Sequence, residues 1–105
     1  MIAALEVTPA WYLLLGAALF SIGTFGLLIR RNPLVMFMCV ELMLNAVTLT
    51  FVTFSRMLAD TGGYSIVIFV LVVAAAEVVV GLAIIVALLR KRPGATADDV
   101  ALLEG

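Results

Sequence analysis

Three long apolar stretches, separated by short polar segments, dominate the chain. They run from Trp11 to Ile29, from Leu34 to Ser55 and from Tyr64 to Leu89. A helix needs about 20 mainly apolar residues to cross the hydrocarbon core of a bilayer, and each stretch is close to that length or longer. The third, with about 26 residues, is long enough to tilt or to extend beyond the hydrocarbon. The pattern predicts an all-α membrane protein, a single domain over residues 1–105 with three transmembrane helices and a tail at residues 90–105.

The polar segments contain the signals that end one helix and begin the next. Asn32 is a favoured N-cap residue, and Pro33 suits the first turn, where its missing N–H is not needed. The second helix is therefore expected to begin directly after them. The segment 56–63 is predicted to be a polar turn, and the Pro93-Gly94 pair is predicted to stop the third helix.

The tail after Pro93 carries a weaker signal. Thr96 and Asp99 have the spacing of a capping box, so a short turn of helix is one alternative. So short a helix is unstable alone, and a disordered tail is the favoured alternative.

Basic residues are distributed unequally between the two sides that three helices define. Arg30 and Arg31 in the first loop lie on the same side as the Arg90–Arg92 segment, whereas Arg56 lies on the other side. Loops rich in Lys and Arg stay in the cytoplasm. We therefore expect the N-terminus outside, and the first loop and the C-terminus in the cytoplasm. The residues before Trp11 include no basic segment, so the first helix is not expected to be a cleaved signal.

The composition agrees with a membrane protein and argues against several kinds of site. The chain is 66% hydrophobic and 12% charged, about half the charged share of an average soluble domain. Its net charge of -1 gives no indication of nucleic-acid binding. It contains no histidine and one cysteine, Cys39, so a Cys/His metal site, a pair of redox cysteines or a disulfide within the chain is not expected. We expect the lipid bilayer as its surroundings and no cofactor or metal bound by this chain.

Two acidic residues interrupt the apolar stretches, Glu41 in the second and Glu77 in the third. A charged side chain at the centre of a bilayer costs about 2.5 to 3.5 kcal/mol on insertion scales, so a glutamate there suggests a function. A low dielectric favours the neutral form of a carboxyl group, which then releases its proton when water or a cation arrives. We therefore interpret Glu41 and Glu77 as proton-transfer residues.

Counting along the helices predicts the depths of the two carboxyl groups. At 1.5 Å per residue, Glu41 lies about 10 Å from the cytoplasmic end of its helix and Glu77 about 18 Å, a difference of about 8 Å. One or two ordered water molecules are needed to join carboxyl groups at that separation. We expect a water-mediated relay rather than two groups that share a proton.

Two neighbours are predicted to support the glutamates. Asn45 lies one turn after Glu41, on the same stripe as Thr48, and its amide can both donate and accept hydrogen bonds. Gly81 lies one turn after Glu77 and leaves space for water or for the close approach of another helix.

Other polar positions have simpler interpretations. Ser21 and Thr24 share one face of the first helix, where hydroxyl groups commonly bond to their own backbone. Arg30 and Arg31 are topology signals, with the binding of a lipid phosphate or a partner's carboxylate as an alternative role. Cys39 and Phe37 are interpreted as packing residues.

A structural role for the glutamates is the alternative that the residues themselves leave open. In that case each glutamate stays neutral and hydrogen-bonds adjacent helices. Two such residues on successive helices would together cost about 5 to 7 kcal/mol if charged, which is comparable with the stability of a domain. This cost favours the functional interpretation.

Two segments and one loop carry a resemblance to a known family. Residues 35–52 read VMFMCVELMLNAVTLTFV and residues 72–86 read VVAAAEVVVGLAIIV, each around one of the glutamates. Together with the loop Arg30-Arg31-Asn32 they resemble the NuoK-type subunit of respiratory complex I, the proton-pumping NADH:quinone oxidoreductase. The resemblance extends from the first span to the end of the third.

The resemblance implies a function, partners and site residues. The chain would be a membrane-arm subunit, with Glu41 and Glu77 as the family's two membrane carboxylates on the path that couples quinone reduction to proton pumping. Arg30 and Arg31 would be the family's paired loop arginines, which influence activity. Its partners would be other small membrane subunits and an antiporter-like subunit. NADH, FMN, iron–sulfur clusters and quinone would be bound by other subunits, and no catalytic activity is expected of the chain alone. The Ala-, Gly- and Val-rich composition favours a bacterial plasma membrane.

The nearest alternative family is the homologous small subunit of multisubunit sodium/proton antiporters, which also has three spans. Its third span generally lacks the central glutamate that Glu77 supplies here, so the complex I interpretation is preferred. A rotor-ring subunit of an ATP synthase has two spans and a small multidrug exporter has four, so both disagree with the three apolar stretches.

Overall fold

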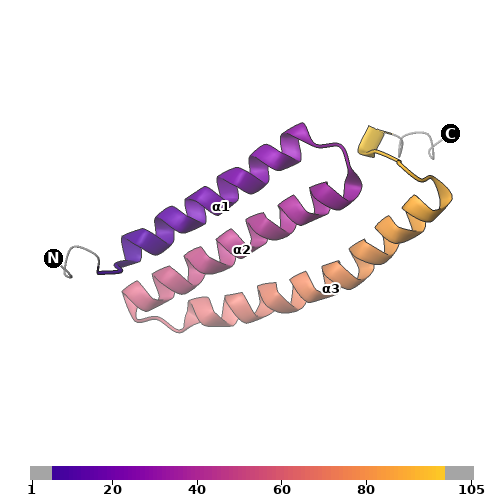
Figure 1. Cartoon of the computed structure of the whole chain (residues 1–105). Coiled ribbons are helices and arrows are strands. Elements are labelled where there is room, and N and C mark those ends of the chain that lie inside the picture. Colours follow the sequence, from indigo (N-terminus) through magenta and orange to yellow (C-terminus); the bar gives the residue numbers. More distant parts are fainter. Residues whose placement is uncertain (1–5, 99–105) are drawn as a thin grey trace.

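The computed structural model describes residues 6–98 of the chain as three helices in a single layer (Figure 1). They are α1 (Pro9–Ile29), α2 (Pro33–Leu58) and α3 (Gly62–Lys91). Successive helices run in opposite directions, and α2 lies in the middle, where it contacts both others. All three are long and apolar enough to cross a membrane, so the prediction of three transmembrane helices is confirmed.

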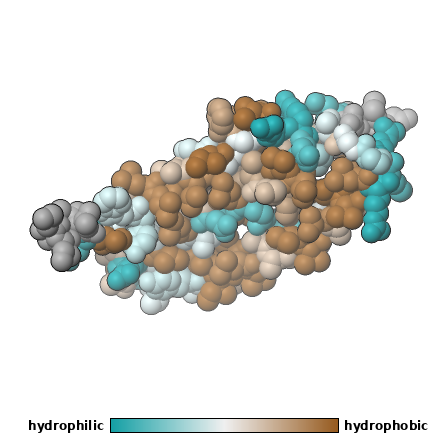
Figure 2. Space-filling model, viewed as in Figure 1, coloured by the Kyte–Doolittle hydropathy of each residue, from teal (hydrophilic) through white to brown (hydrophobic). Residues whose placement is uncertain are grey.

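Few side chains are buried within this layer. Among the described residues, Ala46, Val67 and Ala95 are the buried hydrophobic ones. A layer of 30 by 19 Å in its two shorter dimensions is too thin to enclose a core of its own. Figure 2 accordingly shows apolar residues over most of the visible surface, with hydrophilic residues gathered toward one end and a smaller hydrophilic area near the middle. Lipid chains or other membrane helices must cover such an exterior.

The loop between α1 and α2 is built as the sequence predicts. The side-chain oxygen of Asn32 accepts hydrogen bonds from the N–H groups of Leu34, at 2.9 Å, and Val35, at 3.4 Å. Pro33 occupies the first turn of α2. An N-cap of this kind stabilises a helix by about 1 kcal/mol. The loop is therefore short, and it holds its basic residues at one end of the layer.

The turn between α2 and α3 is shorter than predicted, because both helices extend into it and leave residues 59–61 outside them. Ala59 ends α2 by adopting the left-handed conformation, with a φ of 51°. The N–H of Asp60 donates to the carbonyl oxygen of Ser55 at 3.0 Å, and its carboxylate accepts a hydrogen bond from the backbone at the start of α3. These local hydrogen bonds close the turn, so the prediction for 56–63 was too long.

Glycines allow α1 to pack closely on α2. A Cβ atom at Gly23 would lie 2.8 Å from the backbone oxygen of Cys39 and 2.6 Å from Cγ of Met43. At Gly26 it would lie 2.7 Å from Sγ of Cys39. At Gly23, which faces the α2 backbone, only a hydrogen atom fits, whereas at Gly26 the Cys39 side chain would have to move. This close packing of α1 supports the turn of α2 that carries Glu41.

The chain after α3 turns back toward the first loop (Figure 1). Gly94 makes this turn with a φ of 78°, and Ala95 is buried. The N–H of Ala97 then donates to the carbonyl oxygen of Arg31 at 2.8 Å. The start of the tail thus ties the end of α3 to the first loop. The sequence left a helical turn or disorder open for residues 95–105. Ala97 and Asp98 lie in a 3₁₀ turn, and residues 99–105 lie outside the described residues.

Candidate functional site

Phe37 on α2 and Gly81 on α3 set the register of these two helices. A Cβ atom at Gly81 would lie 2.6 Å from Cε2 and 3.3 Å from Cζ of the Phe37 ring, so the ring lies directly on the glycine. Toward the other end of the pair, a Cβ atom at Gly63 would lie 3.2 Å from the backbone oxygen of Phe51. The space predicted at Gly81 is occupied by the Phe37 side chain of the neighbouring helix. Phe37 acts there as the packing residue that was expected.

This register places Glu41 and Glu77 at nearly the same level of the layer. Glu41 lies one turn after Phe37, and Glu77 lies one turn before Gly81. Because the helices are antiparallel, the four residues from Phe37 to Glu41 and the four from Gly81 back to Glu77 both lead about 6 Å away from the contact in the same direction. Residues one turn apart also share a helix face, so each glutamate lies on or beside the face that packs against the other helix.

The predicted difference of about 8 Å in depth is therefore wrong. It assumed that α2 and α3 end at the same depth. From the Phe37–Gly81 contact, however, α2 extends four residues to Pro33, whereas α3 extends ten residues to Lys91. The additional six residues correspond to about 9 Å of helix, which accounts for the error.

The two carboxyl groups have different surroundings. Glu41 is half-buried, and its Oε1 atom is inaccessible and has no hydrogen-bond partner among the described residues. In the isolated chain Glu77 is exposed, and it lines an open groove of about 600 Å³ beside Phe37 and Val40. Within residues 6–98 no hydrogen bond joins the two carboxyl groups. Glu41 is thus partly enclosed by this chain, whereas Glu77 is accessible to any molecule that packs against α3.

The polar stripe predicted on α2 divides into residues with different roles. Thr48 donates its hydroxyl hydrogen to the carbonyl oxygen of Leu44 at 2.9 Å. Asn45 lies one turn from Glu41, as predicted, but it is exposed and makes no side-chain hydrogen bond to a described residue. Its support for Glu41 stays a prediction.

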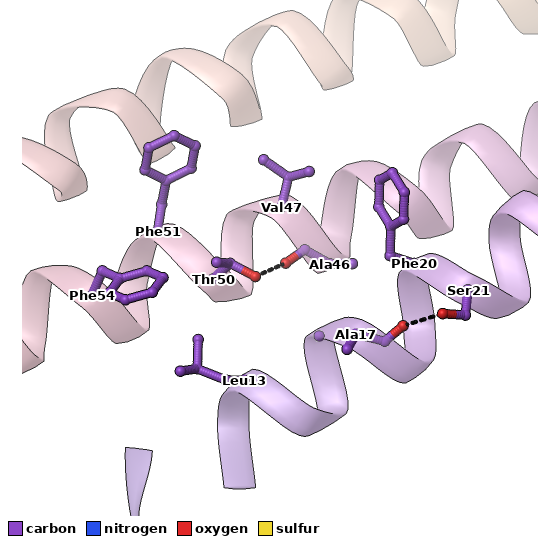
Figure 3. Close-up of a pocket in the computed structure, with 10 residues that line it drawn as sticks. Leu13, Ala17, Phe20, Ser21, Ala46, Val47, Thr50, Phe51 and Phe54 are labelled. Atoms are coloured by element: carbon purple, nitrogen blue, oxygen red, sulfur yellow. Dashed lines mark hydrogen bonds between the residues drawn. The ribbon is translucent and has the colours of Figure 1, made fainter. Parts of the chain in front are cut away.

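Hydroxyl groups between α1 and α2 mostly bond to their own helices. Ser21 donates to the carbonyl oxygen of Ala17 at 2.7 Å, and Thr50 donates to that of Ala46 at 2.9 Å (Figure 3). These residues line a groove of about 660 Å³ whose other side chains are apolar. The groove therefore offers no free polar group for proton transfer. Thr24 differs from Ser21, because its buried Oγ1 has no partner among the described residues, a difference that the sequence did not indicate.

Arg30 and Arg31 are exposed at the end of the layer where α3 also ends. Glu41 lies eight residues, about 12 Å, into α2 from Pro33, and among the described residues no ion pair joins it to Arg31. The influence of the arginine pair on activity stays a prediction.

Residues 6–98 contain no group of three or more His, Cys, Asp or Glu side chains that could hold a metal ion. Cys39 instead packs against Gly26 on α1. The chemistry available in the described part of the chain is that of its two membrane carboxyl groups.

A comparison with known protein families identifies the family of the chain. The chain matches the family described as NADH-ubiquinone/plastoquinone oxidoreductase chain 4L over residues 11–105. The match includes nearly all of α1 and the whole of α2 and α3, and therefore both glutamates and the arginine pair. The resemblance to a complex I subunit is confirmed. The chain belongs to the chain 4L family and is a membrane-arm subunit of NADH:quinone oxidoreductase.

Proposed function

We propose that this subunit transfers protons through Glu41 and Glu77 and thereby helps to couple quinone reduction to proton pumping. The observation that carries the proposal is the register of α2 and α3, which brings the two glutamates to one level on adjoining faces. The buried and unpartnered Oε1 atom of Glu41 supports it.

The surroundings of the two glutamates leave room for a proton path. The Oε1 atom of Glu41 is buried without a hydrogen-bond partner among the described residues, so this atom is free to bond to a water molecule that enters the site. The groove beside Glu77 has room for water and for a polar side chain of a neighbouring subunit. A proton moves between two carboxyl groups that are within hydrogen-bond reach or joined by water.

The common level of the two acids supports transfer within the plane of the membrane. A relay across the membrane needs acids at successive depths, whereas Glu41 and Glu77 differ mainly in the helix to which they belong. In this arrangement the subunit passes a proton sideways between its neighbours. Glu77, which is open at the groove, is the end of the path that faces another subunit.

We also infer the surroundings of the subunit. The first loop and the end of α3 lie at the same end of the layer and carry most of its basic residues, which supports a cytoplasmic location for that end and an outside N-terminus. Small membrane subunits and an antiporter-like subunit contact part of the helix surface in a bacterial plasma membrane. NADH, FMN, iron–sulfur clusters and quinone are bound by other subunits.

Replacement of each glutamate by glutamine tests the proton-transfer role. Glu41→Gln and Glu77→Gln keep the size and most hydrogen bonds of the side chain but remove the exchangeable acid. Proton pumping per assembled complex, measured in vesicles during NADH-driven quinone reduction, is expected to fall about tenfold or more in each variant. Glu6→Gln, at an exposed position before α1, is the matched control and is expected to leave pumping unchanged.

Undiminished pumping in both variants would contradict the proposal. Reduced assembly with unchanged turnover of each assembled complex would favour the helix-bracing alternative. Copurification with peripheral redox subunits separates this function from that of an antiporter subunit, which would show sodium-dependent exchange without them.

A further inference from the structure

Basic side chains gather at the end of the layer that contains the first loop. The hydrogen bond from Ala97 to Arg31 brings this loop next to the end of α3. Within residues 6–98, Asp98 is the single acidic residue at this end, and no ion pair neutralises the basic groups. Within the described part of the chain the cluster therefore carries a net positive charge, and it forms part of the hydrophilic end of the molecule in Figure 2. Its members, all exposed, are Arg30, Arg31, Arg90, Lys91 and Arg92.

An apolar groove on α3 leads to this basic cluster. It has a volume of about 500 Å³ and begins one residue after Glu77, at Val78. Arg90 lies at its other end, twelve residues later, which corresponds to about 18 Å of helix. That length is close to the thickness of one leaflet of hydrocarbon, about 15 Å. The small side chains of Ala83 and Ala87 form part of its lining.

We propose that this groove and the basic cluster bind one anionic phospholipid. An acyl chain lies along the groove, and the phosphate is held by the Arg90 guanidinium with Lys91 and Arg92 beside it. Guanidinium groups bind phosphate oxygens through two parallel hydrogen bonds, and basic residues at a membrane surface attract anionic headgroups. A phospholipid of the surrounding leaflet is the occupant that combines one apolar chain with one negative headgroup at this spacing.

Cross-linking of photoactivatable lipids to the intact complex tests this site. The complex is placed in nanodiscs that contain either phosphatidylglycerol or phosphatidylcholine with a diazirine on the acyl chain, and labelled peptides of this chain are identified by mass spectrometry. Residues 78–90 are expected to be labelled about fivefold more by phosphatidylglycerol, since one basic residue contributes about that factor. Arg90→Gln is expected to remove most of this difference, and Arg90→Lys is expected to keep part of it.

Two further variants distinguish the contribution of the groove to lipid binding from that of the basic residues. Ala87→Leu fills the groove and is expected to lower labelling of α3 by both lipids. Arg56→Gln, at the opposite end of the layer, is expected to change nothing. A native gel establishes that each variant is assembled before labelling.

Equal labelling of residues 78–90 by the two lipids would overturn the proposal, because it would show an ordinary lipid contact without headgroup recognition. Absence of labelling, together with chemical cross-links from this face of α3 to another subunit, would overturn it in favour of a covering protein helix. Neither result depends on whether Glu41 and Glu77 transfer protons.

Discussion

The Phe37 ring lies against the backbone of α3 at Gly81, where Cε2 would be 2.6 Å from a Cβ atom. Glu41 and Glu77 are each one turn from this contact and on the same side of it. The packing of one aromatic ring on one glycine therefore determines how the two membrane acids are placed relative to each other.

Gly81→Leu is expected to push α2 and α3 apart, because the leucine side chain needs the space that the Phe37 ring occupies. Overpacking of this kind costs about 1 to 3 kcal/mol. Thermal stability of the complex and proton pumping per assembled complex should both decrease. Phe37→Ala in the same chain should restore part of each, whereas Val72→Leu, at an exposed position on α3, should have little effect. A double variant no better than Gly81→Leu would show that the ring contact is not responsible.

Relocation of the acid on α2 tests whether water links the carboxyl groups. The combination of Glu41→Gln with Asn45→Glu moves the carboxyl group by one turn, about 6 Å along the helix. A chain of water molecules adjusts to such a shift better than a fixed hydrogen bond does. Proton pumping in vesicles is expected to be lower than that of the wild-type protein but higher than that of Glu41→Gln. If the relocated acid is as inactive as Glu41→Gln, a water-mediated link is contradicted.

Substitution by alanine should reduce stability by different amounts at two glycines of α1. A Cβ atom at Gly23 would meet the backbone of α2, 2.8 Å from the oxygen of Cys39, whereas the nearest atom to one at Gly26 is the Cys39 sulfur. A side chain can rotate away but a helix backbone cannot. Gly23→Ala is therefore expected to cost about 1 to 3 kcal/mol and Gly26→Ala less. Loss of the subunit from the solubilised complex on heating measures the difference. Cys39→Ala should rescue Gly26→Ala but leave the larger part of the Gly23→Ala defect.

The N-cap of α2 should contribute measurably to stability. Asn32→Ala removes the acceptor for the N–H groups of Leu34 and Val35 and is expected to cost about 1 kcal/mol. Asn32→Asp keeps an acceptor and should be nearly neutral. The thermal midpoint of the detergent-solubilised complex reports both effects. Equal midpoints for the alanine and aspartate variants would mean that the cap does not limit stability.

Local features of the fold were predictable from the chain. Each transmembrane stretch is recognised from its own apolar residues, and the start of α2 from the adjacent Asn32 and Pro33. The segments around Glu41 and Glu77 also indicated the family, which the match over residues 11–105 confirms. The turn at residues 59–61 was predicted less well, because its hydrogen bonds depend on the left-handed conformation of Ala59, a residue type that rarely adopts it.

The amino-acid sequence by itself determined the three spans, the N-cap of α2 and the presence of two membrane acids, since each depends on neighbouring residues. The tertiary structure alone decided that Glu41 and Glu77 share a level, that the Glu41 Oε1 atom lacks a partner, and that the tail meets the first loop. These features depend on contacts between residues far apart in the chain, such as Phe37 and Gly81. Helix lengths do not encode such contacts, because antiparallel helices of unequal length can pack in many registers until particular side chains select one.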